Sequence, residues 1–277
     1  MIEKIKYPDG SFYTKVNEFK PEITFRLNSY EDLWQLGQIK DVYDHNNQEL
    51  SVIIPNLLDA QADRRFDEHE STNLKMVCKF INKLNFKKVS VFHPHNAEVV
   101  EALIDNVKII DNSDYIYEVL AELKSNYDFN AYDMEANLIL MSSDAGGFKP
   151  LIKLCDKLEW KGETYSASKS RDKETHKLTQ LIDRQDFGGK DILIVDDICV
   201  KGGTFKGLST MLKERNCGKL YLAVSHTTIQ DLGENPVTDY FEKVFTSNSK
   251  YDYYHIEKGN QLKYTVVPKN LEVIKIF

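Results

Sequence analysis

Two adjacent carboxylates, Asp196 and Asp197, are followed closely by two glycines and a threonine, Gly202, Gly203 and Thr204. Paired carboxylates can hold ribose hydroxyls or a hydrated Mg²⁺ ion. Glycines let backbone amides approach a phosphate closely, and the threonine can cap a helix that begins there. Either pair alone is common in ordinary turns, but together in this order they indicate a site for a sugar phosphate.

The flanking segments predict the elements that position these residues. Four apolar residues at 192–195 are typical of a strand that is covered on both faces. After the glycines, the apolar spacing predicts a helix that ends near Gly218, where a C-terminal cap is expected. One face of this helix carries Phe205, Leu208, Met211 and Leu212. Because ligands bind at the carboxyl ends of strands in such sheets, we expect the site there.

Strands and helices alternate along the whole chain, which predicts an α/β fold with parallel sheets. Strands are expected at 50–54, 89–92, 137–141, 165–167, 192–195, 220–224, 264–267 and 271–277. Helices are expected at 71–84, with Ser71 or Thr72 as cap, and at 147–158. The charged stretch 168–185 suits a surface flap. A polar, turn-rich stretch at 125–133 predicts two domains, at 1–125 and 126–277.

Composition excludes several classes of protein. The net charge of −7 argues against a nucleic-acid partner, which would require a basic face. No apolar run approaches 18 residues, so no membrane-spanning helix is expected. The N-terminus lacks the apolar segment of a secretory signal, and the four scattered cysteines suit reduced thiols. We therefore expect a cytoplasmic protein whose hydrophobic fraction of 42% can form a sizeable core.

Five further segments match one family in order and spacing. They are Tyr7-Pro-Asp-Gly-Ser11, Ala60-Gln-Ala-Asp-Arg-Arg65, His93-Pro-His95, Ser143-Asp-Ala-Gly-Gly147 and Lys169-Ser-Arg171. Together with the segment at 191–204, they resemble ribose-phosphate diphosphokinase, also called PRPP synthetase. The resemblance extends from about Tyr7 to about His226. It implies two phosphoribosyltransferase-like, Rossmann-like parallel-sheet domains, the first binding ATP and the second binding a ribose phosphate.

The family transfers the β,γ-diphosphate of ATP to the anomeric hydroxyl of a 5-phosphoribose, with Mg²⁺. Such a transfer needs positioning and charge cancellation more than covalent chemistry. The resemblance implies that Lys169 and Arg171, in the flap, are the catalytic cations. A cation about 4 Å from a phosphate oxygen interacts by about 4 kcal/mol at an effective dielectric near 20. Two contacts of that kind, made mainly in the transition state, would raise the rate by several powers of ten.

The resemblance also assigns the ATP side of the site. Its ATP contacts match Tyr7, Asp9, Ser11, Arg64 and His95. Guanidinium groups such as Arg64 can grip phosphates or stack on adenine. His95 is in addition a candidate Mg²⁺ ligand. The family's adenine loop reaches into a neighbouring subunit's site, which implies a homo-oligomer, at least a dimer.

The resemblance assigns the residues that bind the acceptor to two loops. The first contributes Asp144, also a candidate Mg²⁺ ligand, with Gly146 and Gly147. The second contains the acidic pair and the turn after it. Its matching residues are Asp196, Asp197, Val200, Lys201, Gly202, Gly203 and Thr204.

Several positions depart from the family pattern. His93 replaces an aspartate, which puts one Mg²⁺ ligand in doubt, Gln61 replaces an arginine, and Ser11 replaces an acidic residue. In the phosphate turn, Val200 and Lys201 replace an aspartate and a threonine. Losing a hydroxyl donor and gaining a long cation suits a 5′-group that extends beyond one phosphate. Two acceptors therefore remain open, ribose 5-phosphate and ADP-ribose, the latter giving ADP-ribose 1-diphosphate for NAD metabolism.

Two other functions share part of this pattern. A type I phosphoribosyltransferase would have the segment at 196–204 but would not need Asp63-Arg64-Arg65 or His93-Pro94-His95. A non-catalytic regulatory subunit would keep the fold and lose the chemistry. The replaced acidic residues favour that reading, whereas Lys169, Arg171, Asp196 and Asp197 oppose it.

Overall fold

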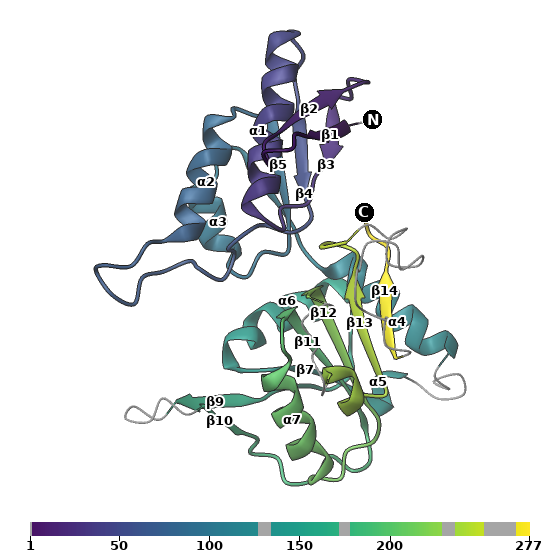
Figure 1. Ribbon diagram of the computed structural model, residues 1–277. Coiled ribbons are helices and arrows are strands. Elements are labelled where there is room, and N and C mark those ends of the chain that lie inside the picture. The colour runs from purple at the N-terminus through teal and green to yellow at the C-terminus, as the bar shows by residue number, and fades with distance from the viewer. Residues whose placement is uncertain (1, 127–133, 172–177, 229–235, 252–269) are drawn as a thin grey trace. The chain divides into compact units, whose positions relative to one another are not determined.

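The chain folds into two compact α/β units, shown in Figure 1. The computed structural model describes residues 2–126, 134–171, 178–228, 236–251 and 270–277. The first unit comprises Met1–Asp111 with Phe277, and the second comprises Asn112–Ile276. This division lies before the boundary expected at residue 125, because helix α4 (Ser113–Asn126) packs against the second unit's elements α6, β12 and β14.

The first unit has a four-stranded parallel sheet in the order β3-β4-β5-β6. A separate antiparallel hairpin, β1–β2, contacts helix α1 through β2. The elements are β1 (Ile2–Lys6), β2 (Phe12–Val16), β3 (Glu22–Thr24), α1 (Tyr30–His45), β4 (Ser51–Ile54), α2 (Asn73–Lys83), β5 (Lys88–Phe92), α3 (Ala97–Leu103) and β6 (Val107–Ile110).

The second unit has a six-stranded sheet in the order β14-β13-β12-β11-β7-β8, and every neighbouring pair is parallel. A separate antiparallel hairpin, β9–β10, interrupts the alternation. The elements are α4, α5 (Met134–Asn137), β7 (Leu138–Ser142), η1 (Ala145–Gly147), α6 (Phe148–Leu158), β8 (Thr164–Ser166), β9 (Ser168–Arg171), β10 (Leu178–Leu181), β11 (Asp191–Cys199), α7 (Gly203–Lys213), β12 (Leu220–Thr227), η3 (Val237–Tyr240), β13 (Lys243–Ser247) and β14 (Leu271–Ile274).

The core of the second unit follows from the apolar strands. Helix α7 buries Phe205, Leu208 and Leu212 against Ile192 and Ile194 of β11. The alternate residue Leu193 is also fully buried, so both faces of the strand are covered, as the run of apolar residues predicted. The predicted α/β class with two parallel-sheet domains is therefore confirmed.

Several local predictions need correction. Strand β11 continues to Cys199, so the two aspartates lie within the strand and not after it. The N-cap of α7 is Gly202, and Thr204 lies inside the first turn. The helix ends at Lys213, so Gly218 is not its cap; the Gly218 amide instead donates to the Lys190 carbonyl. The strand expected at 264–267 lies outside the described residues.

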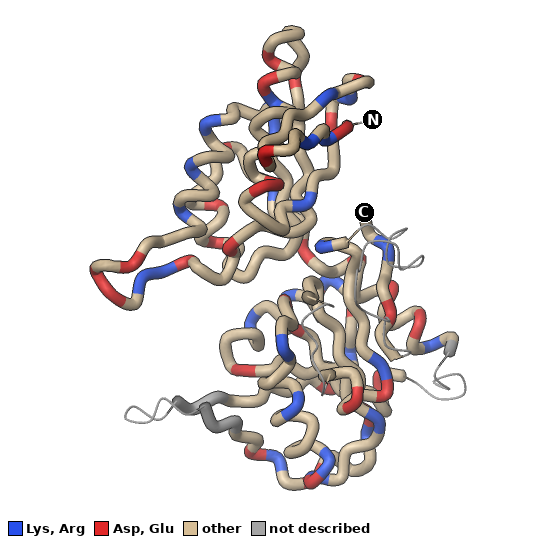
Figure 2. The backbone as a smooth tube through the Cα atoms, in the orientation of Figure 1, with Lys and Arg blue, Asp and Glu red and all other residues tan. Residues whose placement is uncertain are grey.

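Charged residues of both signs are interspersed over the two units, as Figure 2 shows. Among the described residues, no helix is both long and apolar enough to cross a membrane.

Candidate functional site

The carboxyl ends of four neighbouring strands, β7, β11, β12 and β13, meet at one edge of the larger sheet. The registers pair Val195 with Ser142 and Asp196 with Val224, and pair Val224 with Thr246. Ligands of open parallel sheets bind outside this edge. The structure thus brings the predicted acidic pair, the phosphate turn and the Asp144 loop to neighbouring strand ends.

The Asp196 carboxylate is held by long-range and local donors. It accepts hydrogen bonds from the Ser143 hydroxyl at the end of β7 and from the Asp197 amide, the latter at 2.8 Å. Burial raises the pKa of Asp196 to about 7, with the adjacent Asp197 carboxyl adding to that shift. The folded state therefore favours proton binding at Asp196, and a cation bound beside the pair would oppose it.

The phosphate turn connects the end of β11 to helix α7. Gly202 has a positive φ of 71°, and an added Cβ would lie 2.6 Å from the Val237 side chain. Only glycine fits this conformation and this space. The cap residue is a glycine, so it makes no side-chain hydrogen bond to the amides of the first turn. Those amides and the helix dipole can receive an anion.

A second loop follows β7. The Asp144 side chain accepts a hydrogen bond of 3.0 Å from the Gly147 amide, which shapes the short helix η1. The Asp144 carbonyl accepts from the Ser142 and Ser166 hydroxyls, at 2.9 and 3.1 Å. The loop is therefore fixed at its backbone and presents Gly146 and its neighbours at the sheet edge.

The predicted catalytic cations lie on strand β9. Lys169 and Arg171 occupy alternate positions there, opposite Gln180 and Leu178 of β10. The expected flap is thus a β-hairpin in its described part, while residues 172–177 lie outside the described ranges.

Polar contacts anchor the base of this hairpin. The Arg184 side chain pairs with Glu163, and the Arg184 amide donates to the Tyr165 hydroxyl at 3.0 Å. Glu163 also pairs with Lys190 at 3.2 Å. The hairpin therefore extends from a fixed base next to β8.

Hydrogen bonds to Asp63 hold the residues of the first unit that are predicted to bind ATP. Arg64 donates to Asp63 from Nε and from Nη2, at 2.9 and 3.1 Å, and Asn96 also donates to Asp63. The Arg64 guanidinium lowers the pKa of Asp63, with smaller contributions from Asn96 and His95. The structure thus brings Arg64 and His95 to one place beyond the ends of β4 and β5. His93, before it, has a positive φ of 34°.

Three other predicted ATP contacts, Tyr7, Asp9 and Ser11, lie in the turn that joins β1 to β2 (Figure 1). The Asp9 carboxylate accepts from the Ser11 amide and hydroxyl, at 2.9 and 2.7 Å, and the hydroxyl lowers the pKa of Asp9. Tyr7 is 53% exposed, so its ring can stack on a base.

Sequence reasoning missed a buried polar network at the ends of β12 and β13. His226 Nδ1 lies 2.8 Å from the Ser249 hydroxyl, which donates to the Ser225 carbonyl at 3.0 Å. The Ser247 hydroxyl donates to the same carbonyl. In the sequence, this network was indicated only by the polar residues that follow the two apolar strands.

The predicted metal ligands do not form a cluster in the described part of the chain. Among the described residues, no three His, Cys, Asp or Glu side chains gather closely enough to hold a metal ion. The proposed ligands His95 and Asp144 belong to different units. A Mg²⁺ ion at such a site would be held largely by substrate phosphates and water, as is usual for this ion.

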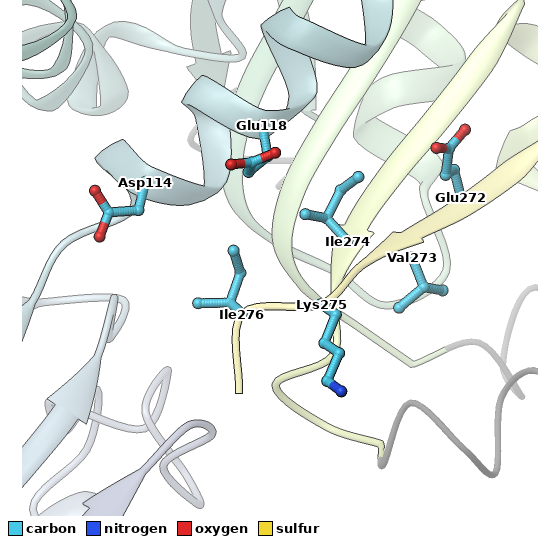
Figure 3. Close-up of a pocket in the computed structure, with 7 residues that line it drawn as sticks. All are labelled: Asp114, Glu118, Glu272, Val273, Ile274, Lys275 and Ile276. Carbon is cyan, nitrogen blue, oxygen red and sulfur yellow. The ribbon is translucent and has the colours of Figure 1, made fainter.

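A hollow of about 420 Å³ lies elsewhere, beside β14 and the start of α4. It is lined by Asp114, Glu118, Glu272, Val273, Ile274, Lys275 and Ile276. Figure 3 shows its three carboxylates projecting from separate places without converging, and Glu272 pairs with Lys243 at 2.9 Å. The hollow contains none of the predicted site residues, so the strand ends define the candidate site.

Comparisons with known proteins bear on the family and the fold of the chain. Residues 106–258 match the family described as Phosphoribosyl transferase domain, and the chain belongs to this family. It is also similar to two archaeal proteins named ribose-phosphate pyrophosphokinase. The protein from Sulfurisphaera tokodaii is 23% identical over 90% of this chain and 84% of its own length. That from Pyrococcus abyssi is 26% identical over 81% of this chain and 75% of its own.

A solved structure supports the fold. Phosphoribosylpyrophosphate synthetase from Mycobacterium smegmatis superposes with a TM-score of 0.74 at 16% identity, covering 100% of this chain and 86% of that one. The resemblance to the ribose-phosphate diphosphokinase family that the motifs indicated is therefore confirmed.

Proposed function

We propose that the protein is an enzyme that transfers the β,γ-diphosphate of ATP to the anomeric hydroxyl of a ribose phosphate, releasing AMP. The observation that carries this proposal is the phosphate turn after β11, preceded by the acidic pair, in a chain similar over most of its length to ribose-phosphate pyrophosphokinases. The acidic pair would hold the ribose hydroxyls, and the turn would hold the 5-phosphate.

In this scheme each unit has a separate task. The Arg64–His95 group would bind the ATP phosphates, and Lys169 and Arg171 would neutralise the migrating diphosphate. Mg²⁺ would enter with the nucleotide and screen its charge, with His95 and Asp144 as candidate contacts. The match of the Tyr7–Ser11 turn to the family's adenine loop, which reaches into a neighbouring subunit's site, supports a site shared between subunits, and hence a homo-oligomer.

Ribose 5-phosphate is the acceptor favoured by the names of the relatives. The turn itself supports a second candidate, ADP-ribose, because Val200 is 38% exposed and Lys201 is also exposed. An open side of the turn leaves room for a 5′-group to continue past the first phosphate. A lysine at that opening can pair with a second phosphate.

One assay tests both the reaction and the acceptor. The protein is incubated with ATP and Mg²⁺, and with either ribose 5-phosphate or ADP-ribose, and AMP is measured. AMP that depends on one acceptor identifies the reaction and the substrate. Release of ADP alone would refute a diphosphoryl transfer, because that transfer cleaves between the α and β phosphates.

A double substitution then tests what selects the acceptor. Val200→Asp with Lys201→Thr should shift kcat/KM toward ribose 5-phosphate and away from ADP-ribose by more than about tenfold, or about 1.4 kcal/mol. The change Lys219→Thr, at an exposed residue immediately before β12, is a matched control and should leave the acceptor preference unchanged. A strong native preference for ribose 5-phosphate that the double change does not alter would refute the extended acceptor.

A further inference from the structure

The Cys199 carbonyl, immediately before the phosphate turn, is held by two donors from the end of β12. The Thr227 hydroxyl donates to it at 2.9 Å, and the Thr228 amide donates at 3.1 Å. Thr227 and Cys199 are 3% and 2% exposed. Because bulk water does not reach these groups freely, the side-chain bond is not readily exchanged for a bond to solvent.

The other end of the turn is fixed by packing. Gly202 lies against Val237, which is buried in the η3 segment and contacts the core beneath α7. Between these anchors, Val200 and Lys201 remain exposed. The turn is therefore restrained at both ends and open in the middle, a geometry that fixes its amides before any ligand arrives.

We propose that Thr227 is a positioning residue for the acceptor: its hydroxyl holds the Cys199 carbonyl and so keeps the amides of the phosphate turn convergent. This inference rests on the proposed function. A turn that is ordered in advance loses less conformational entropy when it binds a phosphate. Thr227 should therefore govern affinity for the ribose phosphate and leave affinity for ATP unchanged.

The test compares three variants. Thr227→Val keeps the shape of the side chain but removes the donor, and Thr227→Ser keeps the donor. Thr246→Val is the matched control, because Thr246 is 1% exposed on the neighbouring strand β13 and its hydroxyl makes only a 3.4 Å contact to the Ser247 carbonyl. Melting temperatures establish that all three variants are folded.

Two measurements are made on each variant. The first is hydrogen–deuterium exchange of the peptide that contains residues 200–204, without any substrate. The second is KM for the acceptor and for ATP in the AMP assay. In Thr227→Val, exchange in the turn should quicken, and the acceptor KM should rise about fivefold to tenfold, the size of one buried hydrogen bond, with the ATP KM within about twofold.

Thr227→Ser should restore both values, and Thr246→Val should change neither. Unchanged exchange in Thr227→Val, no rescue by serine, or an equal rise in both KM values would overturn the inference. If the unmodified protein releases no AMP with either acceptor, the proposed function fails. The exchange measurement still decides whether Thr227 restrains the turn, so the two failures are distinguishable.

Discussion

The two compact units hold their polar groups in different ways. In the first unit, the candidate ATP contacts are satisfied by near neighbours in the sequence, as Asp9 is by Ser11 and Arg64 is by Asp63. In the second, the polar groups at the strand ends pair across the sheet, as Ser143 does with Asp196 and Thr227 with Cys199. In the first group, Asp9, Ser11 and Arg64 are exposed, whereas in the second group Ser143, Thr227 and Cys199 are buried. We infer that changes in the first unit affect binding, and that changes in the second affect both binding and stability.

The largest effect is expected outside both groups, at the β9–β10 hairpin. Lys169→Ala should lower kcat by at least about a hundredfold and leave the ATP KM nearly unchanged, because the contact is made in the transition state. Steady-state kinetics on this variant and on the exposed control Lys161→Ala measure the effect. An unchanged kcat would make Lys169 an ordinary surface charge.

A pair of glycines with positive φ tests the contrast directly. Gly202→Ala should raise the acceptor KM more than about tenfold and destabilise the fold by about 1–3 kcal/mol, because its Cβ would meet Val237 at 2.6 Å. Gly10→Ala, in the first unit, has a φ of 88° and no atom within 4 Å of the added Cβ, so it should cost only about 1 kcal/mol. Chemical denaturation and kinetics on both variants measure the difference. Equal losses of stability would remove the contrast between the two units.

A smaller effect is expected for the exposed arginine. Arg64→Ala should raise the ATP KM by about fivefold to thirtyfold, equivalent to about 1–2 kcal/mol for a charge-assisted contact, with little change in melting temperature. Arg65→Ala, one residue along and also exposed, is the control. A fall in melting temperature without a change in the ATP KM would show that Arg64 serves the fold.

The last prediction concerns the dependence of stability on pH. The pKa of Asp196 is raised from 3.8 to about 7 by burial first and then by Asp197, so the folded state binds the proton more tightly than the unfolded state does. The stabilisation is complete below about pH 4 and is lost as pH rises through about 7. Asp196→Asn, which resembles the protonated form, should therefore melt higher than the unmodified protein at pH 8, and the gap should shrink toward pH 5. A gap that widens on acidification would contradict this sign.

The parts of the structure that were predictable are those set by local periodicity. The helix expected at 71–84 is observed at Asn73–Lys83, because Leu74, Val77, Cys78 and Ile81 form one buried face. The strand at 192–195 was predicted from its run of four apolar residues. The structure buries that run on both faces of the sheet. The extension through Asp196 to Cys199 was missed, since pairing with β12, and not the residue types, keeps this polar segment in the sheet.

The missed parts of the site have partners far away in the sequence. No residue close to Thr227 in the sequence indicates that its hydroxyl donates to the Cys199 carbonyl. Likewise, no residue close to Val237 in the sequence indicates that it packs against Gly202. His226 and Ser249 are likewise joined only by the pairing of β12 with β13. Such contacts follow from strand order, which a single sequence does not give.

The strand order also has a consequence for biosynthesis. The acceptor edge requires segments from Ser142 of β7 to Ser249 beyond β13, and all of their pairings are parallel. Parallel pairs form slowly, because a long crossover must close before the contacts can form. The roughly 100 residues between these ends take on the order of ten seconds to be translated. Within that interval, the apolar β11 lacks a neighbour along one edge until β12 has been made. An unpaired apolar edge is where chains aggregate. The yield of active protein should therefore depend on the rate of its synthesis and on the temperature during synthesis.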